Sequence, residues 1–306
     1  MQVFRSISDF HTDNQTVVTI GTFDGVHMGH RRIIKQLVDE SAEGESTLLT
    51  FFPHPRMVLQ GISSVTLLNT IDERIALLRE AGIENLIVHP FDATFANLDA
   101  EEFVARILVQ KLKIRKIIIG HDHRFGVNRS AGIEDLMLYG KQFGFDVEQI
   151  SPQQIDDVSV SSTKIRQALF SGDISRANSF LGYPYMLTGV VTKGQQLGRT
   201  LGFPTANLHI PEAYKLIPAS GVYAVSSEIN NQTVYGMMNI GTRPTVSGEH
   251  QTIETNFFDF SGDLYGKNLG IKVIERLRDE QKFSSVESLK KQLQQDEQSC
   301  RRVFGI

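Results

Sequence analysis

Short apolar runs alternate with amphipathic stretches over the first half of the chain. The runs lie at 17–20, 47–52, 86–88 and 116–119, and almost every residue in them is aliphatic, aromatic or threonine. Strands that are apolar along nearly their whole length are typical of parallel sheets covered on both faces. Between the runs, apolar residues recur at helical spacing, as in 31–40. The pattern predicts an α/β fold built on a doubly wound parallel sheet.

Capping signals mark where some of these helices begin. Thr70 and Glu73 have the spacing of a capping box ahead of an apolar stripe, and Asp99 precedes a second stripe. Two further helical stretches, at about 162–169 and 175–181, close this half of the chain.

The pattern of apolar residues and the glycine and proline content change after the Gly-Tyr-Pro segment at 182–184. The second half of the chain has short β-branched strands, frequent glycine and proline, and a hairpin signal at 229–232, before a charged helix over roughly 284–301. We therefore predict an α/β domain over 1–183 and a compact all-β barrel with a terminal helix over 184–306. The length of 306 residues, about twice that of a typical domain, agrees with two domains.

Charge, hydropathy and cysteine content argue against a nucleic-acid scaffold, a membrane protein and a disulfide-bonded protein. Against 35 acidic residues stand 31 Lys and Arg, a net charge of −4 that disfavours a nucleic-acid scaffold. No run approaches the ~18 apolar residues of a membrane span, and the N-terminus lacks the order of a signal peptide. Cys300 is the single cysteine, so no intramolecular disulfide can form. We expect a cytoplasmic protein whose partners are small molecules rather than nucleic acid or membrane; homo-oligomerisation stays open.

The segment 21–30 lies between the first predicted strand and the first helix, where a doubly wound sheet places its ligand crevice. Gly21 and Gly29 allow close approach of the backbone, and the helix N-terminus directs free N–H groups at an anion. His27 and His30 could neutralise phosphate charge. The alternative is a pair of turn histidines with no ligand.

Two other segments come directly after strands and face the same edge, 51–55 and 120–126. His121 and His123 could in principle ligate a metal, although further ligands are missing. Asp122 is better suited to a ribose or adenine contact, and an ordinary capped loop remains the alternative.

The informative string of the second half is 198–207. Its glycines suit a loop whose backbone approaches a phosphate, and Thr205 and Asn207 offer the hard oxygen ligands that Mg²⁺ accepts. A plain turn followed by a strand would explain the same residues.

Four motifs carry a resemblance to a known family. The His-x-Gly-His string at 27–30 resembles the nucleotidyltransferase signature, and 161–166 (SSTKIR) looks like the second marker of that superfamily. The string 198–207 resembles the GxxxGxPTAN motif of riboflavin kinases, and 254–257 comes next in that family's order. From end to end the chain resembles the prokaryotic bifunctional riboflavin kinase/FMN adenylyltransferase family, also called FAD synthetase.

The resemblance implies a Rossmann-like adenylyltransferase domain, a riboflavin-kinase-like barrel, and two reactions. Riboflavin would take the γ-phosphate of ATP to give FMN, and FMN would take the adenylyl group of a second ATP to give FAD and pyrophosphate. It also implies Mg²⁺. Rival hypotheses are a monofunctional nucleotidyltransferase whose barrel only binds, and a flavin-sensing or RNA-binding regulator.

The resemblance also assigns residues. In the kinase half, Glu254 would be the general base, Thr205 and Asn207 would coordinate Mg²⁺, and ATP or flavin would be bound by Gly198, Gly202, Pro204, Asn256 and Arg278. In the adenylyltransferase half, His27 and His30 would be catalytic, with ATP bound by Gly21, Phe23, Asp24, Gly29, Asp122, Ser162, Thr163 and Arg166.

Some assignments stay open at this stage. The run 278–280 is either a loop that closes over flavin and nucleotide or an ordinary helix-capping charge run. Phe52 and Pro53 are candidates for FMN contact by location only, as is Asp122. Cys300 has no base partner in the sequence, which argues against a catalytic role.

Overall fold

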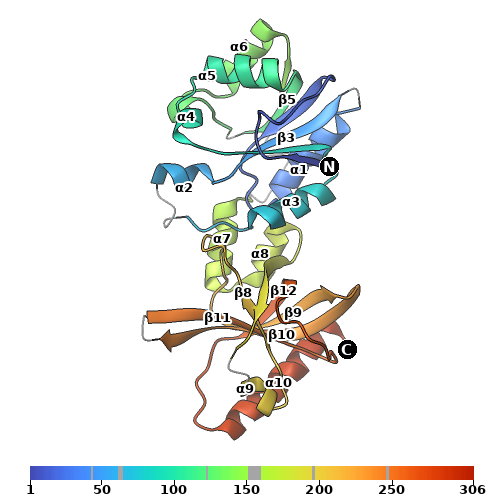
Figure 1. The fold of residues 1–306 in the computed structure, drawn as a ribbon, viewed down its shortest axis with the longest axis vertical. Helices are drawn as coiled ribbons and strands as arrows, with labels where there is room; N and C mark the ends of the chain where they lie inside the picture. The colour runs from blue at the N-terminus through green and yellow to red at the C-terminus, as the bar shows by residue number, and fades with distance from the viewer. Residues whose placement is uncertain (43, 61–64, 122, 151–159, 195–196, 246–247) are drawn as a thin grey trace. The chain divides into compact units, whose positions relative to one another are not determined.

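The chain divides into two units, Met1–Ser161 and Ser162–Ile306. The computed structural model describes residues 1–42, 44–60, 65–121, 123–150, 160–194, 197–245 and 248–306 (Figure 1).

The first unit is an α/β fold on a parallel sheet. Within the described residues the sheet has six strands in the order β1-β4-β3-β2-β5-β6, all parallel. The strands are β1 (Gln2–Phe4), β2 (Thr16–Ile20), β3 (Glu45–Phe51), β4 (Asn85–His89), β5 (Ile114–Gly120) and β6 (Asp146–Ile150). Every residue of β2 is buried, which confirms the predicted doubly wound sheet.

Helices cover both faces of this sheet, and Figure 1 draws α5 and α6 on the opposite side from α1 and α3. The π-helix η2 and α6 bring Leu108 and Leu136 into one core with Ile20 and Ile119. The helical elements are α1 (Met28–Asp39), α2 (Pro55–Gln60), α3 (Ile71–Glu80), α4 (Ala93–Ala96), α5 (Ala100–Glu102), η2 (Phe103–Lys111), η3 (Val127–Arg129) and α6 (Ile133–Phe143). The capping box predicted from Thr70 and Glu73 is present at the start of α3.

The second unit contains a closed antiparallel barrel with strand order β10-β11-β8-β7-β12-β9. The strands are β7 (Tyr185–Thr192), β8 (Ala206–His209), β9 (Gly221–Ile229), β10 (Gln232–Thr245), β11 (Gly248–Phe257) and β12 (Asn268–Arg278). Asn230 and Asn231 connect β9 to β10 with φ of 53° and 61°, as a tight hairpin of this kind requires. The short helix α9 (Leu197–Thr200) forms where a loop was expected, and α10 (Val286–Phe304) packs on the barrel through Leu293 and Val303.

Two helices ahead of the barrel belong to the second unit by their contacts, α7 (Ser162–Ser171) and α8 (Ile174–Leu181). Asn178 of α8 donates to the carbonyl of Val273 on β12 at 2.9 Å and accepts from the backbone N–H of Tyr185 at 2.7 Å. The compact units therefore divide at residue 161, whereas the sequence pattern places a domain boundary near 183. That boundary, as a division of function, stays a prediction.

Candidate active sites

The strand order fixes where a ligand crevice lies in the first unit. From β2 the chain adds β3 and β4 on one side, then returns to place β5 on the other. In open α/β sheets ligands bind outside the carboxyl ends of the strands at such a reversal. The segments 21–30 and 121–126 come directly after β2 and β5, so both begin at this point.

The loop after β2 has an unusual backbone. Phe23, Gly25 and Val26 have φ of 48°, 88° and 36°, and a β-branched residue such as valine rarely adopts this left-handed region. The Phe23 ring is buried, and a Cβ on Gly21 would lie 3.1 Å from it. The loop is therefore held in one tight conformation.

His27 and His30 lie together at the N-terminus of α1. His27 is the N-cap, and its Nδ1 accepts the backbone N–H of His30 at 3.3 Å. The two rings stack with centroids 3.6 Å apart and an interplanar angle of 15°. The helix begins without an acidic residue in its first turn, so its N–H groups and dipole favour an anion here.

The pKa of His30 is lower than that of an ordinary histidine. Burial lowers its pKa well below the usual value, and the charges of His27 and Arg74 lower it further. Its Nδ1 is buried and has no hydrogen-bond partner within the described part of the chain.

Asp24 supports the loop from beneath. Its carboxylate is 2% exposed and accepts the backbone N–H groups of Leu68, at 2.9 Å, and Asn69, at 3.3 Å. The guanidinium of Arg74 lies 3.7 Å away. These contacts give Asp24 a role in fixing the loop; its predicted contact with ATP stays a prediction.

The residues after β5 are placed only in part. His121 is exposed, and Asp122 lies outside the described residues. Phe125 belongs to the core, with the ring of His123 stacked 6.1 Å from it. Among the residues that the structure describes, no group of three or more His, Cys, Asp or Glu could hold a metal ion.

Ser161 of the SSTKIR string ends the first unit, and the other five residues, 162–166, begin α7 in the second unit. Ile165 is buried, Thr163 is exposed, and Ser162 and Arg166 are partly exposed. Residues 162–166 therefore belong to the same compact unit as the barrel, whereas the 21–30 loop belongs to the unit of the parallel sheet.

The barrel aligns several predicted residues in one transverse row. Glu254 of β11 lies directly opposite Asn207 of β8 on one side and Asn239 of β10 on the other. Since side chains alternate along a strand, these three share a face. Their chain neighbours Thr255 and Met238 are fully buried in the barrel, which places the row on the outer face.

The 198–207 string is tied to this row by hydrogen bonds. The hydroxyl of Thr205 donates to Glu254 Oε2 at 3.2 Å, and the Asn256 side chain donates to the carbonyl of Pro204 at 2.7 Å. Gly198 accepts the N–H of Phe203 at 2.8 Å, and Gly202 has a φ of 87°. The string and β11 thus form one polar site.

The donor set suits magnesium. Thr205 and Asn207 supply neutral oxygens beside the carboxylate of Glu254, and oxygen ligands are what Mg²⁺ prefers. A Cβ on Gly194 would overlap the amide of Asn207, so a glycine there keeps room for that side chain.

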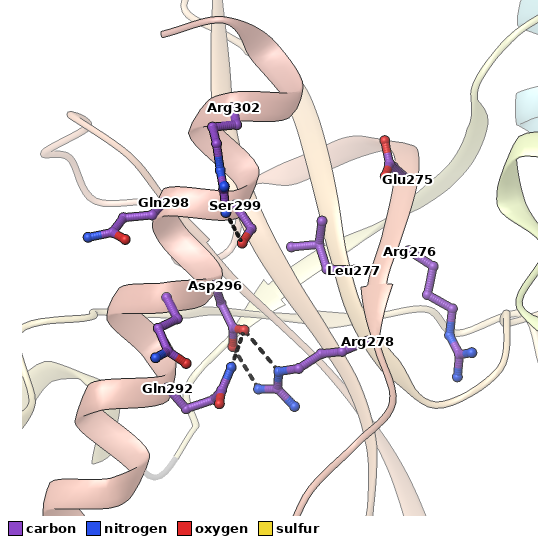
Figure 2. A pocket seen from close by; sticks show the side chains of 10 residues that line it. Glu275, Arg276, Leu277, Arg278, Gln292, Asp296, Gln298, Ser299 and Arg302 are labelled. Carbon is purple, nitrogen blue, oxygen red and sulfur yellow. Dashed lines mark hydrogen bonds and ion pairs between the residues drawn. The ribbon is translucent and has the colours of Figure 1, made fainter.

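Arg278 ends β12 opposite Val222, which is itself opposite Asn239, so it belongs to the same transverse row. Its guanidinium is directed at α10, where Asp296 accepts its Nε at 2.9 Å and a terminal nitrogen at 2.6 Å (Figure 2). The pair lines a cavity of about 480 Å³ between β12 and α10. The predicted contact of Arg278 with ATP or flavin stays a prediction.

Glu280, in the segment after Arg278, lies close to Asn239 of this transverse row. A Cβ on Gly241 would overlap Glu280 Oε1 and lie 3.0 Å from the Asn239 amide. The Glu280 carboxylate therefore lies over β10, where glycine leaves space, close to the strand position opposite Glu254. Sequence reasoning assigned no role to Asn239 or Asp296 and left Glu280 in an open charge run, because strand register and a helix-to-strand ion pair have no local sequence signal.

Cys300 lies in the core between α10 and the barrel with Ala224, Met237 and Phe258. Burial, and then the charges of Asp296, Glu297 and Glu275, raise its pKa to about 12. The thiol is a packing group in this environment.

Comparisons with known proteins match a different family model to each half of the chain. The family model described as FAD synthetase matches residues 9–164, and the one described as riboflavin kinase matches 181–304. The bifunctional riboflavin kinase/FMN adenylyltransferase of Escherichia coli K12 is 35% identical over 311 residues, covering 100% of this chain and 99% of its own. The protein of the same name from Listeria monocytogenes is 36% identical over 302 residues, covering 97% and 95%.

A solved structure shares the fold. It is titled a macrolide-efflux protein from Streptococcus pneumoniae and superposes with a TM-score of 0.89 at 33% identity, covering 98% of each chain. In the part of this chain that the structure describes, no helix is long and apolar enough to cross a bilayer.

Proposed function

The chain belongs to the bifunctional riboflavin kinase/FMN adenylyltransferase family, and from that premise we propose that the barrel site phosphorylates riboflavin and the 21–30 loop serves the adenylylation of FMN. The arrangement of Thr205, Asn207 and Glu254 is the observation that carries the kinase assignment, because it joins a carboxylate to oxygen donors suited to a magnesium nucleotide.

In the kinase half, Glu254 is the proposed general base. An alcohol is a poor nucleophile at neutral pH, so a carboxylate within hydrogen-bond reach takes its proton as the oxygen–phosphorus bond forms and ADP leaves. The Thr205 hydroxyl orients that carboxylate. Thr205 and Asn207 would hold magnesium, which when bound neutralises charge on the transferred phosphoryl group. Gly198, Gly202, Pro204 and Asn256 shape the loop that approaches ATP.

In the adenylyltransferase half, a phosphate oxygen of FMN attacks the α-phosphorus of ATP and pyrophosphate leaves. This step depends on positioning and charge neutralisation, since the attacking oxygen is already anionic. His27, His30 and the N-terminus of α1 are the proposed partners of the triphosphate, with Gly21, Phe23 and Gly29 shaping the cradle. Ser162, Thr163 and Arg166 are proposed as further phosphate ligands, and Asp122 as a nucleotide contact, on the family motif alone.

Product analysis with matched variants tests both assignments. The protein is incubated with Mg²⁺ and ATP plus either riboflavin or FMN, and flavins are separated by chromatography. E254Q should abolish FMN formation and leave FMN-to-FAD conversion intact, whereas H30A should do the reverse. E228Q is the matched control, because Glu228 also accepts a threonine hydroxyl, from Thr233 at 2.7 Å, but is exposed elsewhere on the barrel. Failure of the wild-type chain to form either product would overturn the proposal.

We further propose a cytoplasmic location, with no nucleic-acid or membrane partner. The net charge of −4 and the single cysteine support this. Riboflavin, FMN and ATP are small-molecule partners by the family's activities. A boundary of function near residue 183 fits the start of the kinase match at residue 181.

A further inference from the structure

A buried ion pair lies beneath the loop that connects β2 to α1. The Asp24 carboxylate is 2% exposed, and the side chain of Arg74 is fully buried, with their closest atoms 3.7 Å apart. Neither residue reaches solvent, so neither has an ordinary surface role. Buried charges are costly unless each compensates the other, which makes such a pair worth explaining.

The loop above this pair needs support. Val26 and Phe23 both have positive φ, a conformation that persists only where the surroundings impose it. Asp24 lies between them and is bound by two backbone N–H groups of the segment before α3, at Leu68 and Asn69. The carboxylate thus fastens the loop to a rigid neighbour.

Arg74 is held in place from the other side. It comes directly after the capping box of α3, in which the Thr70 hydroxyl accepts the N–H of Glu73 at 3.1 Å and the Glu73 carboxylate accepts the N–H of Thr70 at 2.9 Å. The helix is therefore fixed where it presents Arg74 to Asp24. The charge of Arg74 also acts on His30: burial, then His27, then Arg74 lower the pKa of that histidine.

We propose that Arg74 is a positioning residue for FMN adenylylation: it holds Asp24 so that the loop at 21–30 and its two histidines are set to receive a triphosphate. The proposal rests on the function assigned to that loop. Arg74 acts through Asp24 and the backbone, and contact with the nucleotide is not part of its role. The Asn69 side chain lies in the segment that binds Asp24. Its buried polar atoms have no hydrogen-bond partner among the described residues, so the region beneath the loop contains further buried polar groups.

The test compares both reactions of the full-length chain. R74M should lower kcat/KM for FMN adenylylation by about 10²-fold, the cost of a misplacement of about 1 Å in a reacting group, and raise KM for ATP in that reaction. R74K should recover part of the loss. Riboflavin phosphorylation should stay at the wild-type level, which also shows that the chain has folded. R106M is the matched control, since Arg106 pairs with Glu102 on the surface of the same unit.

The double variant D24N/R74M shows whether Asp24 and Arg74 act as a pair or whether each substitution disturbs the protein independently. If the two residues act together, the double variant should lose less activity than the product of the two single losses, because no uncompensated charge remains. Multiplicative losses, or an R74M variant with normal adenylylation, would overturn the proposal. A wild-type chain that makes no FAD from FMN would instead overturn the function on which it rests.

Discussion

Thr205 and Glu254 come from neighbouring segments of the barrel, and the hydroxyl of the first donates to the carboxylate of the second at 3.2 Å. T205V keeps the shape of the side chain and removes this bond together with an oxygen ligand. Loss of a residue that orients a ligand or a base costs about 10- to 100-fold. We expect T205V to slow riboflavin phosphorylation by that factor in a steady-state assay, with FMN adenylylation unchanged. T205S retains the hydroxyl and is the control; equal activity of T205V and wild type would contradict the role.

Gly241 leaves the space that Glu280 occupies above β10. A methyl group there would overlap the Glu280 carboxylate, and overpacking costs about 1–3 kcal/mol. Because Glu280 lies on an exposed segment, we expect G241A to displace that segment rather than unfold the barrel. KM for riboflavin should rise about 5- to 160-fold, the factor to which an overpacking cost of this size converts.

Gly270 provides the matched control for this substitution. It also lies in a barrel strand, but a Cβ there would meet only the Thr188 hydroxyl at 3.8 Å, an ordinary contact. G270A should therefore keep the wild-type KM, and a G241A protein that does the same would show that Glu280 has no part in binding.

The Arg278–Asp296 pair joins the end of β12 to α10. Asp296 is 4% exposed and also accepts the Gln292 side chain at 2.9 Å. Hydrogen bonds to charged groups contribute about 1.5–3 kcal/mol, so D296N should lower the free energy of unfolding by an amount in this range. Urea titration followed by circular dichroism measures it. D259N is the comparison: Asp259 pairs with Arg301 at the surface, where solvent screens the charges, so its loss should lower the free energy of unfolding by less than D296N does.

The sequence predicts the parts of the fold that depend on local pattern. Continuous apolar runs located β2 to β5, and the Asn-Asn turn located the β9–β10 hairpin, because burial and turn chemistry are written in neighbouring residues. The strands β1 and β6 were missed. The first is three residues long, and the second, Asp146–Ile150, is buried only at its last residue, so neither gives a periodic signal.

The candidate sites were predictable as motifs but not as geometry. The strings around His27 and Thr205 can be read along the chain. The row that joins Asn207, Glu254 and Asn239 depends on register between strands far apart in sequence. Arg74 lies 50 residues from Asp24, so its support of the loop emerges only once the chain has folded.

Burial of His30 links stability to pH. Its pKa is lowered in the folded protein, so below about pH 6.5 the unfolded chain binds a proton that the folded chain does not. The free energy of unfolding should therefore fall as pH falls through this window, by at most about 1.4 kcal/mol per pH unit from this group. Urea titrations at about pH 7.5 and about pH 5.5, on either side of the ordinary histidine pKa, measure the change. H30Q should lose less stability on acidification than wild type, while H11Q, altered at an exposed histidine, should match it.

The reactivity of Cys300 measures how readily α10 separates from the barrel, because the thiol is buried in the core between them. It is the single cysteine of the chain, fully buried, with a pKa of about 12. The thiolate is the reactive form, and at about pH 8 a thiol of this pKa is ionised about 10³-fold less than an ordinary one. Ellman's reagent should therefore label the native protein at least about 10³-fold more slowly than the urea-unfolded chain, where one thiol per molecule should react at the rate of a free cysteine. Rapid labelling of the native protein would show that α10 separates readily from the barrel. It would then contradict the view that the Arg278–Asp296 pair holds α10 on β12.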